Sequence, residues 1–224
     1  GNVKGRIVGR AVSNAHETPL REWFEPQQLR TTTKGGLECL IHTVRIHLEM
    51  NPNHVIVKLD IRNMFNEIKR AEIIRIFESE PELRDMVPYL FAVHSPASPV
   101  FYADGKRAGK SCAEGTRQGS AEAGTAACAA IHPALRAADA ELSAMGGFAR
   151  ADFDDTYLVG PPAAVAAALD RFGAAIALVG AELQRAKSAA LCGAECELPV
   201  DFPVPLGSSR RPDGSVIGSG IKGA

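Results

Sequence analysis

Three carboxylates crowd into the stretch 151–160, whose sequence is ADFDDTYLVG. Apolar and aromatic residues flank Asp152, Asp154 and Asp155, and glycines or prolines bound the stretch on both sides. This pattern predicts a β-hairpin with the acidic residues at its tip. Carboxylates packed this closely repel one another, so a fold that gathers them usually supplies a cation. For this stretch alone, a solvated acidic turn is an equally good interpretation.

A fourth carboxylate closes the run 54–60, HVIVKLD. Its β-branched, mostly apolar residues predict a buried strand that ends at Asp60. A carboxylate in that place is costly unless it is paired or bound to metal, although a lone aspartate there is more often a turn residue or a helix cap. If this strand and the acidic hairpin are neighbours in one sheet, their carboxylates converge. Such a spot suits two magnesium ions about 3.5–4 Å apart that bridge a triphosphate and an attacking hydroxyl.

The elements that must position these carboxylates follow from apolar periodicity. One helix is predicted around 37–48 and another over 163–179, because apolar residues recur there at three- and four-residue steps. An alanine-rich helix is predicted from about 121 to 144, and Pro133 should kink it or begin a second helix. Residues 98–112 are predicted to form a second hairpin, which is basic.

The remaining segments give weaker signals. Ser79 and Glu82 resemble a capping box that starts a short helix. Residues 1–25 show no pattern that determines an element. From Pro199 the chain is rich in proline, glycine and serine, which predicts a loop or a flexible end without a core of its own.

The composition is that of a globular protein with one large domain, or one domain and a small subdomain: 224 residues, 46% hydrophobic and 23% charged. A formal net charge of -1 counts against a self-sufficient nucleic-acid binder, which is normally basic. No apolar run is long enough to span a membrane. The five cysteines are odd in number and irregularly spaced, which favours a reduced intracellular setting over a disulfide framework.

Five segments around these carboxylates carry a resemblance to reverse transcriptases. VKLDIRNMFNEI (57–68), TRQGSAEAG (116–124), FDD (153–155) and GAELQRAKS (180–188) resemble, in order, the motifs LD-x-x-NAFN, QG-x-x-x-G, Y-x-DD and GL-x-LN-x-x-KS. Upstream, the segment from Gln28 through GGLE (35–38) to His42 and Arg45 resembles GG-x-E-x-x-VH-x-x-R. The type most similar is that of non-long-terminal-repeat retrotransposons. Each motif is weak by itself, but five in the correct order with sensible gaps form a strong signal.

The resemblance implies an α+β fold: a polymerase palm, formed by an antiparallel sheet backed by helices, with a partial fingers subdomain and no thumb. Residues 1–50 would be partial fingers and 51–192 the palm, with 70–117 contributing to the fingers. Residues 193–224 would be a Pro/Gly-rich connection toward a missing thumb.

The resemblance also implies a metal site. Asp60 and Asp154 would bind two catalytic Mg²⁺ ions, for which Mn²⁺ can substitute, and Asp155 would lie beside them. Lys187 would approach the triphosphate as the proton donor to pyrophosphate. The simpler alternative for Lys187 is a solvated lysine.

The nucleotide contacts implied by the resemblance lie in the first two motifs. The backbone at Asn63 and Met64 would face the triphosphate, and Gln118 and Gly119 would line the nucleotide and template side. Phe65 would be a steric gate whose ring excludes a ribose 2′-hydroxyl. The simpler alternatives are a core position for Phe65 and a loop hydrogen bond for Gln118.

The function implied is RNA-directed DNA polymerisation, by two-metal transfer of deoxynucleotides onto a primer 3′-hydroxyl. The partners would be an RNA template, a DNA primer, deoxynucleoside triphosphates, and the missing thumb and other parts of a parent polyprotein. An isolated fragment is expected to have little activity. The setting would be intracellular, and nuclear by family resemblance.

Two departures from the motifs support a rival hypothesis. Asp152 replaces the usual aromatic residue of the third motif, and Glu122 adds negative charge near a negatively charged substrate. Both favour a degenerate, non-catalytic domain that resembles reverse transcriptases and binds nucleic acid or partners. A second rival, an RNA-dependent RNA polymerase, is disfavoured by Phe65, because a bulky gate excludes ribonucleotides.

Overall fold

One four-stranded antiparallel sheet organises the chain. The computed structural model describes residues 3–29, 34–95, 97–117, 119–192, 209–210 and 216–217. The sheet has the strand order β5-β6-β1-β8, and its strands are β1 (Val55–Leu59), β5 (Phe148–Asp152), β6 (Asp155–Gly160) and β8 (Ala189–Cys192). Every neighbouring pair is antiparallel. The predicted α+β class, an antiparallel sheet backed by helices, is confirmed.

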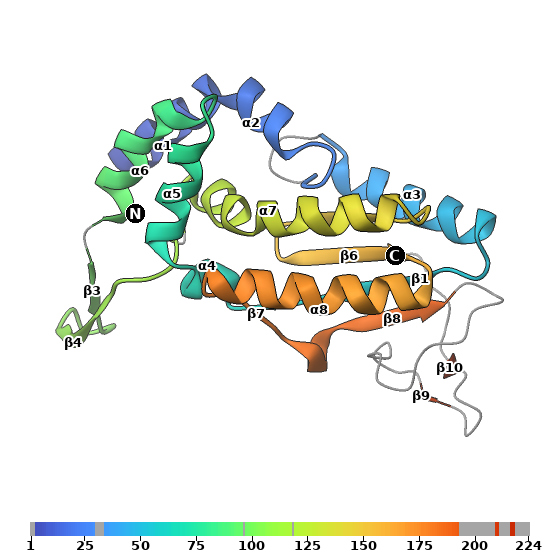
Figure 1. Cartoon of the computed structure of the whole chain (residues 1–224). Helices are drawn as coiled ribbons and strands as arrows, with labels where there is room; N and C mark the ends of the chain where they lie inside the picture. Colours follow the sequence, from blue (N-terminus) through green and yellow to red (C-terminus); the bar gives the residue numbers. More distant parts are fainter. Residues whose placement is uncertain are drawn as a thin grey trace.

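The two faces of this sheet bury different side chains. Successive residues of a strand point to opposite faces, so Val55, Val57 and Leu59 join the main core while Ile56 joins a second, smaller core. The main core is built with α7 (Ala123–Ser143) and α8 (Pro162–Leu178), which lie in front of the strands in Figure 1. The smaller core is built with α3 (Gly36–Met50).

Most of the remaining helices gather beyond one end of the sheet (Figure 1). They are α1 (Val3–Ala15), α4 (Met64–Glu67), α5 (Arg70–Ser79), the 3-10 helix η1 (Arg84–Met86) and α6 (Val87–His94). Helix α2 (Glu17–Phe24) lies between α1 and α3 in the same view, and the sequence pattern predicted neither α1 nor α2. The predicted basic hairpin is formed by β3 (Ser98–Phe101) and β4 (Arg107–Cys112). Shorter pieces complete the fold: β2 (Ile61–Arg62) pairs with β7 (Glu182–Leu183), η2 spans Arg185–Lys187, and β9 (Ser209–Arg210) pairs with β10 (Val216–Ile217).

The structure overturns one of the two alternatives for Pro133 and the capping box at Ser79. Helix α7 runs through Pro133, so the alternative of a second helix there is wrong, while a kink stays a prediction. Its buried face continues on both sides of the proline, at His132 and Leu135, and this packing outweighs one missing hydrogen bond. The Ser79 capping box is also wrong, because Ser79 is the last residue of α5 and its hydroxyl donates to the Ile76 carbonyl at 2.8 Å.

The described helices include none that is both long enough and apolar enough to cross a membrane. The predicted Pro/Gly-rich end lies largely outside the residues that the structure describes.

Candidate active site

The acidic stretch forms the predicted hairpin. Strands β5 and β6 are joined by a two-residue loop, Phe153-Asp154, and Asp152 pairs with Asp155 across it. Phe153 has a φ of 59°, in the left-handed region that non-glycine residues rarely adopt. The loop thereby places Asp154 at the tip of the hairpin.

The strand that ends before Asp60 runs antiparallel to β6 and beside it. Leu59 pairs with Thr156, so Asp60 follows at the end of the sheet where Asp154 lies in the hairpin loop and Asp155 begins the neighbouring strand. Burial raises the pKa of the Asp154 carboxyl, and the charges of Asp155 and Asp60 raise it further. The structure therefore brings the three aspartates to one end of the sheet, where the charges of Asp155 and Asp60 act on Asp154.

The segment that follows α8 holds the end of β1. The Gln184 N–H donates to the Asp60 carbonyl at 2.8 Å, and the Asp60 N–H donates to Ser188 Oγ at 3.3 Å. The Ser188 hydroxyl in turn donates to the Gln184 carbonyl at 3.2 Å. The backbone of Asp60 is thus fixed by residues of the fourth motif.

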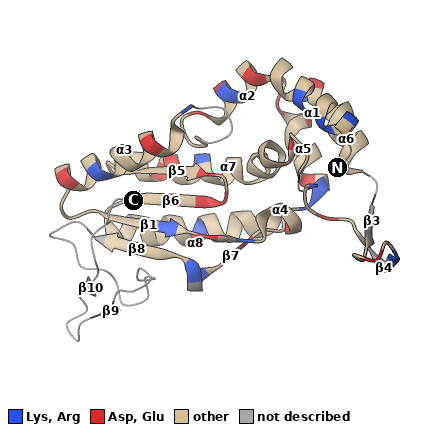
Figure 2. Cartoon of the chain, turned by 180° about the vertical axis from the view of Figure 1, so that it is seen from behind, with Lys and Arg blue, Asp and Glu red and all other residues tan. Residues whose placement is uncertain are grey.

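A lysine that the sequence argument did not single out neutralises part of this charge. Lys58 Nζ lies 2.7 Å from Asp155 Oδ2 and 5.9 Å from the centroid of the Tyr157 ring. Burial alone would lower the pKa of Lys58. The hydrogen bond to Asp155 and the charges of Asp155 and Tyr157 together outweigh burial, so the pKa of Lys58 is raised. Strand alternation was the available signal, because Lys58 and Asp60 share a face of the strand. Figure 2 shows the basic residue on β1 beside the acidic end of β6.

The aromatic ring of Phe65 contacts the hairpin tip. Its centroid lies 6.1 Å from that of Phe153, with an interplanar angle of 66°. The Phe65 carbonyl accepts the Thr116 N–H at 2.7 Å, and the Gly115 N–H donates to the Ile68 carbonyl at 2.7 Å. The loop of the second motif is therefore attached to α4. Phe65 also packs on the main core, so core packing and a steric gate are compatible roles.

Asn63 and Met64 begin α4. Asn63 has a φ of 44° and its side-chain amide donates to Glu67 Oε1 at 3.1 Å. The Met64 side chain is buried in the main core. Any contact of Met64 with a nucleotide must therefore come from its backbone, as the resemblance implied.

The other predicted residues are less closely tied to the aspartates. Gly119 has a φ of 85° and faces open space, while Gln118 lies outside the described residues. Lys187 ends η2 and is exposed. The described residues show no ion pair between Lys187 and any of the three aspartates.

The expected negative charge of Glu122 beside the substrate is wrong. Glu122 is fully buried, accepts the Tyr89 hydroxyl at 3.0 Å and lies 3.7 Å from His94 Nε2. Burial and the Glu122 charge raise the pKa of Tyr89 to about 12. Glu122 belongs to the interior below α6, where the Tyr89 hydroxyl and the nearby His94 ring offset part of the cost of burying a carboxylate.

The oxygen ligands that the three aspartates offer at this end of the sheet fit a hard cation. Asp60, Asp154 and Asp155 offer only carboxylate oxygens, which Mg²⁺ prefers, and burial together with the charges of Asp155 and Asp60 raises the pKa of Asp154. Across the described ranges, no three His, Cys, Asp or Glu side chains are already close enough together to hold a metal ion. Metal binding would therefore require Asp155 to exchange the ammonium of Lys58 for the ion.

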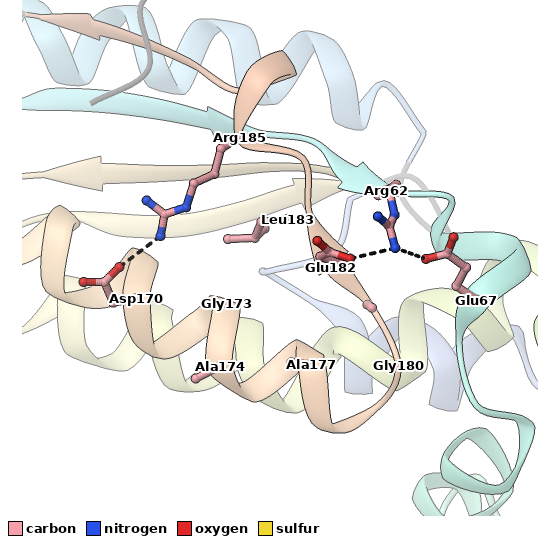
Figure 3. A pocket seen from close by; sticks show the side chains of 11 residues that line it. Arg62, Glu67, Asp170, Gly173, Ala174, Ala177, Gly180, Glu182, Leu183 and Arg185 are labelled. Carbon is pink, nitrogen blue, oxygen red and sulfur yellow. Dashed lines mark hydrogen bonds and ion pairs between the residues drawn. The ribbon is translucent and has the colours of Figure 1, made fainter. Parts of the chain in front are cut away.

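A separate pocket of about 730 Å³ lies between α8 and β7 (Figure 3). Two ion pairs border it, Arg62 with Glu182 at 2.7 Å and Arg185 with Asp170 at 3.3 Å. None of the predicted site residues lines this pocket, so we do not assign the chemistry to it.

No protein-family profile matches the sequence, and no curated protein sequence matches it either. Solved telomerase structures match the fold. Apo telomerase from Candida tropicalis is 11% identical over 83% of this chain and 36% of its own, with a TM-score of 0.61. The same telomerase truncated from its C-terminal domain is 12% identical over 96% and 45%, with a TM-score of 0.60. Telomerase from Candida albicans in complex with the TWJ fragment of telomeric RNA is 12% identical over 95% and 38%, also with a TM-score of 0.60.

The chain thus spans between about a third and under half of the telomerase chains that it matches. TM-scores of 0.60 and 0.61 over most of this chain show a shared fold, although the sequence identity is low. The chain has a reverse-transcriptase-like fold, similar to that of telomerase, over most of its length.

Proposed function

We propose that this chain is the catalytic core of an RNA-directed DNA polymerase, a reverse transcriptase of a non-long-terminal-repeat retrotransposon. The observation that carries the proposal is the convergence of Asp60, Asp154 and Asp155 at one end of the sheet in a reverse-transcriptase-like fold. The ring of Phe65 beside the hairpin tip supports the same function. The order of the sequence motifs supports the retrotransposon type.

In this proposal the primer 3′-oxygen forms a bond to the α-phosphorus of a deoxynucleotide, and the bond from that phosphorus to pyrophosphate breaks. Two bound Mg²⁺ ions would stabilise the negative charge on both the attacking and the leaving oxygens. Asp60 and Asp154 would hold the ions, with Asp155 beside them. Lys187 would donate a proton to pyrophosphate as it leaves.

The nucleotide would be oriented by α4 and the neighbouring loop. The backbone at Asn63 and Met64 would face the triphosphate, and Gln118 and Gly119 would line the nucleotide and template side. The Phe65 ring would exclude a 2′-hydroxyl by occupying its place. Positioning of this kind contributes much of the rate in phosphoryl transfer.

The partners we propose are an RNA template, a DNA primer, deoxynucleotides and the other domains of a longer polyprotein. A matched telomerase was solved in complex with a telomeric RNA fragment, which supports RNA as one partner. Nuclear action is proposed together with the retroelement origin.

The test is primer extension on an RNA template with Mg²⁺, using the longest natural form of the protein. Asp154→Asn should reduce extension at least about 10²–10³-fold, the scale on which one electrostatic catalytic group acts. Asp104→Asn, in the exposed turn of the β3–β4 hairpin, is the matched control and should leave extension unchanged. A wild-type protein that extends no primer, with Asp154→Asn making no difference, refutes the proposal.

The gate has its own test. Phe65→Ala should reduce discrimination between deoxynucleotides and ribonucleotides by about 10–200-fold, the range for filling or emptying one apolar contact. Competition between the two nucleotide types in single-nucleotide extension measures it. An unchanged ratio would remove Phe65 from the proposal and leave the metal site standing.

The second candidate is a degenerate domain that binds nucleic acid without catalysis. Asp152 favours it, because this carboxylate stands opposite Asp155 in place of the usual aromatic residue and adds negative charge to the hairpin. Burial raises the pKa of the neighbouring Tyr157, and the charges of Asp155 and Asp152 raise it further. RNA binding by both the wild type and Asp154→Asn, with no extension by either, would establish this alternative.

A further inference from the structure

The tip of the acidic hairpin has an unfavourable backbone conformation. In two-residue hairpin loops with a positive φ only at the first loop residue, glycine is strongly preferred there. Here that residue is Phe153, with a φ of 59°. A bulky side chain resists this conformation, so the surrounding structure has to hold it.

The side chain of Gln28 contacts this residue from a distant part of the sequence. Gln28 Nε2 donates to the Phe153 carbonyl at 3.2 Å, and the Phe153 N–H donates to Gln28 Oε1 at 3.3 Å. Gln28 is fully buried, with an exposed fraction of 0%. Its amide therefore satisfies both backbone groups of Phe153, as a neighbouring strand would.

The backbone around Gln28 is itself anchored. The Gln28 N–H donates to the Phe24 carbonyl at 2.9 Å. On either side, the Leu29 N–H donates to the Ala151 carbonyl at 3.0 Å and the Ala151 N–H donates to the Gln27 carbonyl at 2.7 Å. Gln28 thus extends from a segment that pairs with β5 two residues before the tip.

The ring of Phe153 is held on the opposite side. A Cβ added at Gly124 would lie 2.8 Å from a ring carbon of Phe153, so the absence of a side chain there makes room for the ring. The same ring contacts Phe65. Backbone and ring of Phe153 are therefore both fixed, and Asp154 is the next residue.

We propose that Gln28 is a positioning residue for the metal-binding carboxylate: by clamping both backbone groups of Phe153, it sets the direction in which Asp154 projects. The inference rests on the proposed function, in which Asp154 holds metal. Gln28 does not contact substrate in this scheme and acts through the Phe153 peptide. Losing the clamp lets the loop relax from its left-handed conformation and turns Asp154 away from Asp60.

The test compares two neighbouring glutamines in the full chain. Gln28→Met keeps the length of the side chain and removes the clamp. Gln27→Met removes the hydrogen bond from Gln27 Nε2 to Asp139 Oδ2, 2.7 Å long, which does not touch the tip, and is the matched control. Two readouts that need no catalysis are used: hydrogen exchange of the Phe153 amide, and Mn²⁺ affinity from the electron paramagnetic resonance signal of the free ion.

Gln28→Met should speed exchange of the Phe153 amide about tenfold or more and weaken Mn²⁺ binding about tenfold, a change of about 1.4 kcal/mol. Gln27→Met should leave both values within about twofold of wild type, a change of about 0.4 kcal/mol. If the two variants behave alike, or if Gln28→Met leaves exchange and affinity unchanged, the positioning role is overturned.

Gln28→Met could fail to fold, and the wild type could fail to bind Mn²⁺; each result has its own consequence. If Gln28→Met does not fold, it is combined with Phe153→Gly, since glycine adopts the left-handed conformation without strain. Recovery of folding supports the clamp, and its absence overturns it. If the wild type shows no Mn²⁺ binding that Asp154→Asn removes, the proposed function fails, and exchange of the Phe153 amide alone still decides whether Gln28 fixes the tip.

Discussion

The hairpin tip and the interior below α6 both hold acidic side chains, in opposite surroundings. At the tip, Asp154 and Asp155 are half-exposed and lie together, with the ammonium of Lys58 2.7 Å from Asp155. Below α6, Glu122 is fully buried and accepts the Tyr89 hydroxyl at 3.0 Å. One place gathers like charges near water. The other holds a single buried carboxylate, with one oxygen hydrogen-bonded to Tyr89 and the other, Oε1, 3.7 Å from the His94 ring without a hydrogen bond.

The difference separates two uses of a carboxylate. A buried group whose hydrogen bonds are supplied by the fold contributes to stability, and losing a partner is costly. At the tip, burial and the charges of the neighbouring carboxylates raise the pKa of Asp154, and a cluster of this kind is stabilised by a bound cation. On this basis we expect mutations at the tip to change activity with little change in folding, and mutations below α6 to do the reverse.

The largest contrast is expected at Asp60. Asp60→Asn removes a metal ligand from the proposed site but keeps its size, so extension should fall about 10²–10³-fold. The free energy of unfolding should change by less than about 1 kcal/mol, since the carboxyl is partly exposed and only its backbone is held by the fold. Steady-state extension and urea titration measure the two quantities.

A loss of several kcal/mol in stability from Asp60→Asn would break the comparison, because the tip would then be a structural cluster like the one below α6. The control is Asp170→Asn, which removes the exposed partner of Arg185 on α8 and leaves the three aspartates in place.

The next effect is expected at Glu122. Glu122→Ala leaves the Tyr89 hydroxyl without its acceptor and opens a small cavity, and should lower the free energy of unfolding by about 1–3 kcal/mol. The pKa of Tyr89, which the buried carboxylate helps to raise to about 12, should fall. Absorbance titration of tyrosine checks this, and an unchanged stability would show that Glu122 is not a structural carboxylate.

The fold around the tip could be predicted because its signals are local or ordered along the chain. A β-branched, mostly apolar run predicted β1, which is buried on both faces, and three-to-four-residue apolar patterns predicted α3 and α8, each of which buries one face. The order of the motifs predicted that Asp60 and the hairpin belong together, and the sheet places their strands side by side.

The errors and omissions share a different cause. The orientation of Glu122 and the clamp from Gln28 depend on contacts between segments far apart, and 125 positions separate Gln28 from Phe153. No local pattern encodes such a pair. The N-terminal helix α1 was missed for a related reason: its large apolar residues, such as Val3 and Ile7, stay exposed, so their pattern did not mark a buried face. Helix α2 does bury Leu20 and Phe24, but its eight residues are too few for a clear apolar period.

A smaller effect concerns the pH dependence of the tip. The pKa of Asp154 is raised by burial and by its acidic neighbours, so its ionised form costs stability at pH above that pKa, and the cost disappears as the pH falls through it. Without metal, Asp154→Asn should therefore be slightly more stable than wild type at pH 7, by less than about 1 kcal/mol for a half-exposed group. The difference should vanish on acidification toward pH ~4, near the ordinary range of an aspartate.

Saturating Mg²⁺ should reverse that order at pH 7, because a cation that binds only the folded wild type adds to its stability. Thermal unfolding with and without Mg²⁺ at two pH values gives all the quantities needed. A variant less stable than wild type in every condition would contradict the crowding of charge at the tip.

The smallest effect is expected at Lys58, where the comparison is most finely tested. Its ion pair with Asp155 is exposed on both sides, with side-chain exposures of 43% and 36%, so Lys58→Met should change the free energy of unfolding by no more than about 1 kcal/mol. The same change frees Asp155 for a cation and leaves the tip more negative. The Mg²⁺ concentration for half-maximal extension should therefore fall about two- to fivefold, equivalent to less than about 1 kcal/mol of binding free energy.

Lys106→Met, which breaks the exposed pair with Asp104, is the matched control and should leave the Mg²⁺ requirement unchanged. A requirement that rises in Lys58→Met would mean that this ammonium assists the bound ions or phosphates and does not compete with them for Asp155.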